Sequence, residues 1–202
     1  MSTIGPVIQK IINLSLTQSL VTSEFKTAIV KPLLKKPNLE LIHQNYRPVS
    51  NLPFGSKLLE QSVIDELEKH FENNDLNDEF QSAYRANHST ETALLPIVKN
   101  VLTSMDNRRA VCMVMLDLSA AFDTLDHNIL IERLTTTQGL GPRVTNWFNS
   151  YLRRRTQRVS VDNATSDHIQ LLDRAVQGSK IGCRLHKKYV ETVRKHAQKI
   201  GM

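Results

Sequence analysis

Apolar side chains recur at helical spacing along much of the chain, and this pattern predicts six helices. The first spans residues 6–20, where Pro6 suits a first helical turn. The second spans residues 57–71, with one apolar stripe and an opposite polar side that includes Glu60. The other four helices are predicted over residues 90–105, 126–138 and 142–152 and from about residue 180 onward.

Other stretches favour extended backbone. Residues 25–34 are rich in apolar side chains, but Pro32 lacks a backbone donor, which limits this stretch to an edge or an irregular strand. Three further prolines break residues 35–54 into a loop. Residues 110–118 are apolar almost throughout, as expected of a strand that is buried on both faces. Residues 156–161 alternate like a short strand.

The composition is that of a folded protein. With 202 residues and 40% hydrophobic side chains, the chain can form one domain or two small subdomains around a real core, which excludes a disordered tail. No signal-peptide pattern follows Met1, and no apolar run reaches the roughly 20 residues that a membrane helix needs. An intracellular protein without a membrane span is therefore expected, and Cys112 and Cys183 are too isolated for a disulfide framework or a zinc site.

The formal charge is unevenly distributed along the chain. Residues 1–54 carry +4, residues 55–150 carry −6 and residues 151–202 carry +8. Basic ends around an acidic middle suit a protein that holds a phosphate backbone on its rims and gathers a divalent metal near its centre. Solvated helix faces and a basic tail explain the same charges equally well, so both interpretations stay open.

One acidic segment combines a predicted buried strand with three carboxylates. Asp117 lies at the exit of the strand, and Asp123 and Asp126 follow within ten residues. Mg²⁺ prefers hard oxygen ligands and commonly takes one or two carboxylates together with substrate phosphates. Helix caps at Asp123 and Asp126 and a turn at Asp117 would fit the same pattern. The residues alone do not decide between these two hypotheses.

The amino-acid sequences of several segments resemble motifs of a known protein family. The string LDLSAAFDTLDH, at residues 116–127, resembles the first palm motif of reverse transcriptases from non-LTR (LINE-type, jockey-like) retrotransposons. FKTAIVKPLLKKP at residues 25–37 and NYRPVS at residues 45–50 resemble the opening fingers motif of these enzymes. EFQSAYR, which begins at Glu79 and is followed by HST, resembles the second fingers motif. The resemblance keeps the family's motif order and covers roughly residues 6–190.

The resemblance implies a fold and a set of substrates. The expected fold is α+β: the fingers and a partial palm of a right-hand polymerase, with helices packed on a small, incomplete antiparallel sheet. It would comprise a fingers-like region with an N-terminal helical extension (residues 1–105), a partial palm (residues 106–183) and a basic C-terminal helix or tail (residues 184–202). An RNA template, a DNA primer and a deoxynucleoside triphosphate (dNTP) would be the substrates of the complete enzyme.

The resemblance also implies roles for individual palm residues. Asp117 would be the catalytic carboxylate that binds Mg²⁺, with the backbone carbonyl of Leu118 as a further metal ligand. Two metal ions in such enzymes activate the primer hydroxyl and stabilise the leaving pyrophosphate. Phe122 corresponds to the bulky gate beneath the deoxyribose, although periodicity alone would make it an ordinary core aromatic.

Basic and turn residues would complete the substrate side of the site. Arg85, Arg47 and Lys31 would face the incoming triphosphate or the template backbone, where guanidinium groups grip phosphate oxygens. Ordinary surface charge is the alternative, above all for Lys31. Gln177 and Gly178 resemble the turn of the next palm motif, which lies against the nascent base pair. Four further arginines could touch nucleic acid or simply end a helix in solvent: Arg153, Arg154, Arg155 and Arg158.

The sequence also departs from the family pattern. Val176 and Cys183 stand where the family favours proline. The aromatic-Ala-Asp-Asp turn that supplies the remaining metal ligands does not occur in these 202 residues, and a thumb is also missing. One aspartate cannot hold two metal ions in catalytic geometry, so a chain that is truncated within the palm and inactive alone is expected. The alternatives are a non-catalytic module that binds nucleic acid or another protein, and a product of a longer reading frame.

Overall fold

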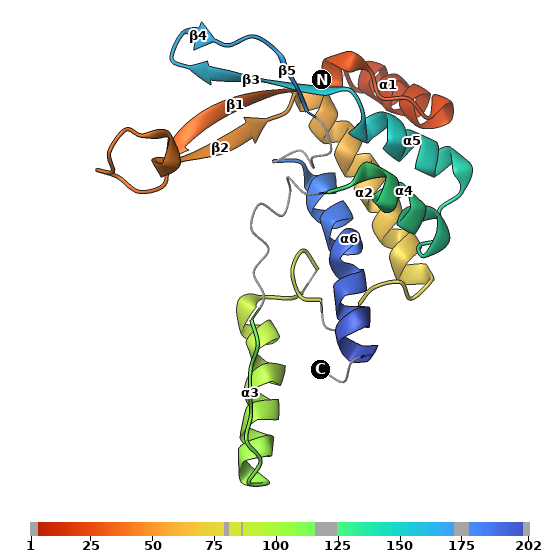
Figure 1. Cartoon of the computed structure of the whole chain (residues 1–202). Coiled ribbons are helices and arrows are strands. Elements are labelled where there is room, and N and C mark those ends of the chain that lie inside the picture. The colour runs from red at the N-terminus through yellow and green to blue at the C-terminus, as the bar shows by residue number, and fades with distance from the viewer. Residues whose placement is uncertain (1–3, 79–80, 86, 116–124, 172–177, 200–202) are drawn as a thin grey trace.

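The computed structural model places a small sheet above a group of packed helices, and one further helix extends away from both (Figure 1). It describes residues 4–78, 81–85, 87–115, 125–171 and 178–199, with the backbone alone described for residues 192–199. No helix in these ranges is long and apolar enough to cross a membrane.

The six predicted helices are confirmed, and local sequence signals explain where several of them begin. Ser89 forms a capping box with Thr92, and Asp126 accepts hydrogen bonds from the backbone of Asn128 and Ile129 at 2.7 and 3.0 Å. Pro142 is the first residue of its helix. The helices are α1 (Ile4–Gln18), α2 (Phe54–Asn73), α3 (Thr90–Asp106), α4 (His127–Thr136), α5 (Pro142–Leu152) and α6 (Lys180–Lys199).

The sheet is mixed, which corrects the expected antiparallel sheet while confirming the α+β class. Its strand order is β2-β1-β3-β4, and β5 also pairs with β3. β1 runs antiparallel to β2 but parallel to β3, because the long connection through the helices returns the chain in the same direction. The strands are β1 (Thr27–Leu34), β2 (Tyr46–Asn51), β3 (Arg155–Val161), β4 (Ala164–Thr165) and β5 (Ile169–Leu171).

One expectation for the first strands was wrong and another holds in part. Residues 35–54 are not all loop, because β2 forms within them despite Pro48. β1 pairs with β3 along its first half, Thr27–Val30, but is an edge of the described sheet on that side along the half that holds Pro32. Pro32 lies beyond that pairing and is paired with Pro48 of β2. The two prolines, which both lack a backbone N–H, therefore face each other in the sheet.

The main core lies between helices and not between helices and sheet. Leu59, Ile64 and Leu67 of α2 pack with Phe148 of α5 and Leu185 of α6, and all five are buried. The sheet contributes a smaller buried pair, Ala28 of β1 with Leu52 just after β2. Most of the buried apolar residues therefore lie where α2, α4, α5 and α6 meet.

The predicted buried strand at residues 110–118 is wrong over its described part. Residues 110–115 form neither helix nor strand and are exposed. A strand is buried on both faces only when neighbours flank it, and no described strand pairs with this segment. α3 is also uncovered: none of its residues is buried, and it projects from the other helices in Figure 1.

Candidate nucleic-acid interface

One face of the sheet gathers basic side chains from three strands. Leu33 of β1 pairs with Arg47 of β2, and Ile29 of β1 pairs with Arg158 of β3. Because paired residues point to the same side and alternate residues share a face, Lys31, Arg47 and Arg158 lie on one face. Lys31 and Arg47 are exposed, and Arg158 is half-buried. We call these three residues the basic sheet face.

The opposite side of β1 explains why the cations point outward. Ala28 and Val30, at alternate positions of the same strand, are 1% and 5% exposed. Their burial fixes the register, because a slip of one residue would bury Lys31 and expose both apolar side chains. The packing of the sheet therefore holds the basic sheet face toward solvent.

Gly178 joins the turn before α6 to strand β2. Its φ is +80°, a left-handed conformation that favours glycine, and a Cβ at this position would overlap the carbonyl oxygen of Ser50. Ser50 lies on the strand that carries Arg47. The structure thus brings Gly178 and strand β2 together.

A buried hydrogen-bond network holds the start of α6. The Tyr151 hydroxyl donates to Glu60 Oε1 at 2.6 Å and lies 2.7 Å from Ser179 Oγ. The other Glu60 oxygen accepts the backbone N–H of Lys180 at 2.9 Å, and Ser179 Oγ accepts that of Gly182 at 2.9 Å. Both acceptors satisfy donors of the first turn of α6 and suit its positive end. The network therefore fixes the residues next to Gly178.

Arg155 balances the charge of this network. It is 1% exposed, its guanidinium lies 4.6 Å above the Tyr151 ring, and Nη1 donates to the Tyr151 carbonyl at 2.8 Å. Burial raises the pKa of the Tyr151 hydroxyl far above its ordinary value; Arg155 opposes the shift and Glu60 adds to it. Tyr151 consequently stays protonated and remains a hydrogen-bond donor to Glu60.

Arg85 lies against α6 and not on the basic sheet face. Its Nη1 donates to the Asp78 carbonyl at 3.3 Å, and the residue is half-buried. The pKa of Lys187 on α6 is lowered mainly by burial and by Lys188, and the Arg85 charge contributes to the shift. Tyr84 hydrogen bonds Cys183, which raises the pKa of the tyrosine. Tyr84 and Arg85 therefore pack beside α6.

Four expected site residues lie outside the described residues: Asp117, Leu118, Phe122 and Gln177. Among the described residues, no group of three or more His, Cys, Asp or Glu side chains could hold a metal ion. Asp126, which follows the Asp117 segment, is committed to capping α4. Lys31, Arg47, Arg85 and Gly178 are the expected site residues that the structure describes.

Glu60, Tyr151 and Ser179 form part of the site although their roles were not predicted from the sequence. Glu60 was placed on the polar side of its helix, but it is only 1% exposed. The signal was present, because Glu60 precedes Val63, Ile64 and Leu67 at helical spacing and therefore shares their buried face. A carboxylate on the apolar face of a helix implies a polar partner.

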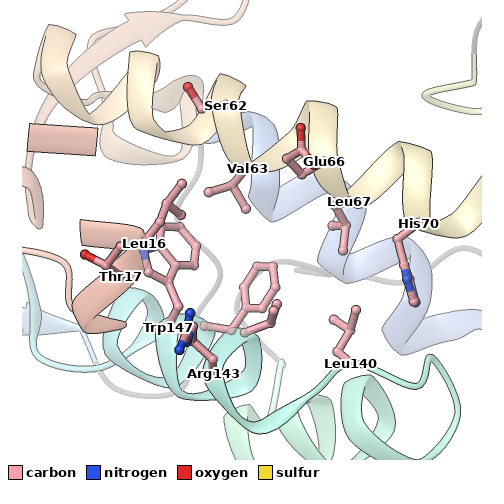
Figure 2. Close-up of a pocket in the computed structure, with 12 residues that line it drawn as sticks. Leu16, Thr17, Ser62, Val63, Glu66, Leu67, His70, Leu140, Arg143 and Trp147 are labelled. Atoms are coloured by element: carbon pink, nitrogen blue, oxygen red, sulfur yellow. The ribbon is translucent and has the colours of Figure 1, made fainter. Parts of the chain in front are cut away.

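A groove of about 360 Å³ lies between α1, α2 and α5 (Figure 2). Leu16, Val63, Leu67 and Leu140 line it beside Trp147, whose indole N–H donates to Ser15 Oγ at 3.0 Å. The lining is mostly apolar and belongs to the helical core, with Glu66, His70 and Arg143 as charged or polar members. Because the groove does not gather several cations as the basic sheet face does, we place the candidate interface on the sheet.

Comparisons with known proteins identify the family of this chain. The family model "Reverse transcriptase (RNA-dependent DNA polymerase)" matches residues 34–201. The chain is 29% identical over 166 residues to a probable RNA-directed DNA polymerase from transposon X-element of Drosophila melanogaster, covering 82% of this chain and 18% of that protein. It is 28% identical over 152 residues to the RNA-directed DNA polymerase from mobile element jockey of the same species, covering 75% and 16%.

A third relative gives the same picture. The probable RNA-directed DNA polymerase from transposon BS of Drosophila melanogaster is 27% identical over 164 residues, which cover 81% of this chain and 18% of that protein. The matched region thus spans less than a fifth of each of these three relatives. The family match nevertheless extends over most of this chain, from the end of β1 through α6. The chain therefore belongs to the reverse transcriptase (RNA-dependent DNA polymerase) family.

Proposed function

We propose that this chain forms the fingers and the first part of the palm of an RNA-directed DNA polymerase of a non-LTR retrotransposon. Its own contribution is to hold phosphate groups of the RNA template, the DNA primer or the dNTP on the basic sheet face. The observation that carries this proposal is the placement of Lys31, Arg47 and Arg158 on one face of the sheet, with Lys31 and Arg47 exposed and with β2 also in contact with Gly178.

Catalysis would require more than the described residues. Asp117 with the Leu118 carbonyl is the proposed Mg²⁺ ligand set, and Phe122 the proposed gate beneath the deoxyribose. Magnesium enters this proposal only through the sequence of that segment, because no described residues form a metal site. We infer that the chain alone does not extend a primer, since one aspartate does not make a two-metal site.

Binding to a primer–template duplex over a salt series tests the proposed role of the basic sheet face. Lys31→Gln and Arg47→Gln should each weaken binding and lower the salt-dependence slope by about one unit, because each removes one phosphate contact. Lys10→Gln, on the exposed side of α1, removes the same charge elsewhere and is the matched control. Equal losses for all three variants would show that net charge alone drives binding and would refute the proposed interface.

Primer extension on an RNA template with Mg²⁺ separates the polymerase proposal from its alternative. We expect no extension by this chain, with or without Asp117→Ala. If the chain extends primer and Asp117→Ala abolishes extension, the inference that it is inactive alone is wrong. Salt-dependent binding without extension, even when further downstream sequence is added, would instead favour a non-catalytic nucleic-acid-binding module derived from the same fold.

A further inference from the structure

Strands β1 and β3 begin at the same end of the sheet and bring two basic segments together. They run parallel, with Thr27 paired with Thr156, and the hydroxyl oxygens of these residues are 3.0 Å apart. The Thr156 N–H donates to the Lys26 carbonyl at 3.3 Å. Lys26 therefore lies beside the residues that precede Thr156, which are Arg154 and Arg155.

Lys26 is a largely buried residue whose ammonium group has no matching anion among the described residues and is not one of their fully enclosed, unpartnered atoms. It is 9% exposed, and no described carboxylate or hydrogen-bond acceptor is placed to pair with its ammonium group. Glu24, the closest acidic residue in sequence, is engaged by a backbone N–H and by the side chains of Thr22 and Ser23, which lower its pKa. Burial lowers the pKa of Lys26, and the charges of Arg155 and Arg154 lower it further.

The three consecutive arginines differ in how far their side chains are engaged. Arg153 donates to Asn149 Oδ1 and Asn128 Oδ1 at 2.5 and 2.6 Å. Arg155 donates to two backbone carbonyls, and its buried Nε has no acceptor among the described residues.

Arg154 differs from both of its neighbours. It is exposed, with a left-handed φ of +56°, and no described residue accepts a hydrogen bond from it. Arg154 and Lys26 are close enough for the charge of one to lower the pKa of the other, and no described anion compensates the two cations.

We propose that Lys26 and Arg154, supported from behind by Arg155, form a binding site for a phosphate group at the end of the sheet where β1 and β3 begin. A guanidinium offers two parallel N–H donors to phosphate oxygens, and the ammonium adds a point charge. The phosphate would be either a free ion or part of a polynucleotide backbone. This site involves none of the residues of the basic sheet face and does not depend on the proposed polymerase role.

Thermal unfolding in inorganic phosphate, against chloride at equal ionic strength, tests the site directly. Phosphate should raise the melting temperature of the wild-type chain, because a ligand that binds only the folded state stabilises it. Arg154→Gln and Lys26→Met should each weaken the apparent phosphate affinity by about tenfold or more, as expected for one lost charge-assisted hydrogen bond. Lys10→Gln removes the same charge from α1 and should keep the wild-type response.

Melting temperatures in chloride show whether a substitution acts by destabilising the fold and not by removing a phosphate ligand. Lys26→Met retains the buried stem while removing an unpaired charge, so it should melt no lower than the wild type in chloride. Arg154 is exposed, so its substitution should leave the fold intact. The proposal is overturned if phosphate gives no stabilisation beyond chloride, or if Lys10→Gln loses as much of the response as the two site variants.

A second arm of the experiment identifies the source of the phosphate. Binding of a short single-stranded RNA is measured for the same variants. If Lys26→Met and Arg154→Gln weaken RNA binding more than Lys10→Gln does, the site holds a polynucleotide backbone. If they change only the response to inorganic phosphate, the site holds a free phosphate ion. Neither result depends on Lys31 or Arg47, so failure here is distinct from failure of the proposed interface.

Discussion

At the scale of single residues, the network around Glu60 contributes most clearly to the site. Glu60→Gln should lower the free energy of unfolding by about 2–4 kcal/mol, because an amide in the same place cannot accept hydrogen bonds from both Tyr151 and the Lys180 backbone. Urea unfolding monitored by circular dichroism measures this loss. Glu66→Gln, which changes an exposed carboxylate on the same helix, should stay within about 0.5 kcal/mol of the wild type.

The partners of Glu60 should respond as a unit. Tyr151→Phe leaves the carboxylate and the Ser179 hydroxyl each short of a partner and should cost about 1–3 kcal/mol. In a double-mutant cycle, Glu60→Gln and Tyr151→Phe should deviate from additivity by roughly 0.5–3 kcal/mol, because both changes break the same hydrogen bond. Additive losses would show that the two side chains are not coupled.

Gly178 is a second position where a single added methyl group should lower stability. Gly178→Ala should lower the free energy of unfolding by about 1–3 kcal/mol more than Gly139→Ala, because its methyl group overlaps the Ser50 carbonyl. Gly139 is the matched control: its φ is +66°, so it shares the cost of a left-handed alanine, but a Cβ there meets nothing within 4 Å. Equal losses would mean that the turn before α6 does not touch β2.

The partly buried imidazole of His186 should make the stability of the fold depend on pH. Burial lowers the pKa of this imidazole in the folded protein, so below its ordinary value of about 6.5 the unfolded chain binds the proton more readily. Stability should therefore fall as the pH decreases through that value toward the folded pKa. His186→Gln should flatten this part of the curve, whereas His43→Gln, which removes an exposed imidazole, should leave the wild-type curve unchanged.

At the scale of elements, α6 is part of the core and not only a basic helix. Ile181 and Leu185 are 0% and 1% exposed. Leu185→Ala should cost about 2–5 kcal/mol of unfolding free energy through lost burial and the cavity left behind. Leu94→Ala makes the same change on α3, where the leucine is 51% exposed, and should cost less than about 0.5 kcal/mol. Denaturant midpoints of the two variants give the comparison.

Helices were predictable from sequence because their signals are local. The cap at Asp126 and the proline at Pro142 act within one helical turn, and both predicted helices formed. Strands were harder. The parallel pairing of β1 with β3 joins residues more than a hundred positions apart, and β2 forms only by pairing with β1, despite its own proline. Apolar residues at 110–115 looked like a buried strand, but burial needs neighbours that a local pattern cannot supply.

The candidate site was predictable only in part for the same reason. Motif resemblance pointed to Arg47 and Gly178, and the structure shows that the β2 strand and the turn that carry them touch through Ser50. It could not show that Arg85 packs beside α6, because that position depends on how two distant segments fold together. Arg158 was assigned to a general arginine cluster, and only the strand register reveals its face.

At the scale of the whole molecule, the chain leaves much of its apolar surface uncovered. Six apolar side chains of α3 are each at least 44% exposed, and four more lie at residues 111–115. Contiguous apolar patches of this kind mark interaction surfaces or sites of aggregation. The residues of α3 are Leu94, Leu95, Ile97, Val98, Leu102 and Met105.

We expect the purified chain to self-associate through this surface. Leu95→Lys combined with Leu102→Lys should shift the sedimentation profile toward the monomer without lowering the melting temperature, because no residue of α3 is buried. The matched control, Ile4→Lys with Val7→Lys on α1, adds the same charges at side chains that are 68% and 57% exposed. If the control suppresses association equally, added positive charge explains the effect; if only the α3 variant does, the association runs through α3.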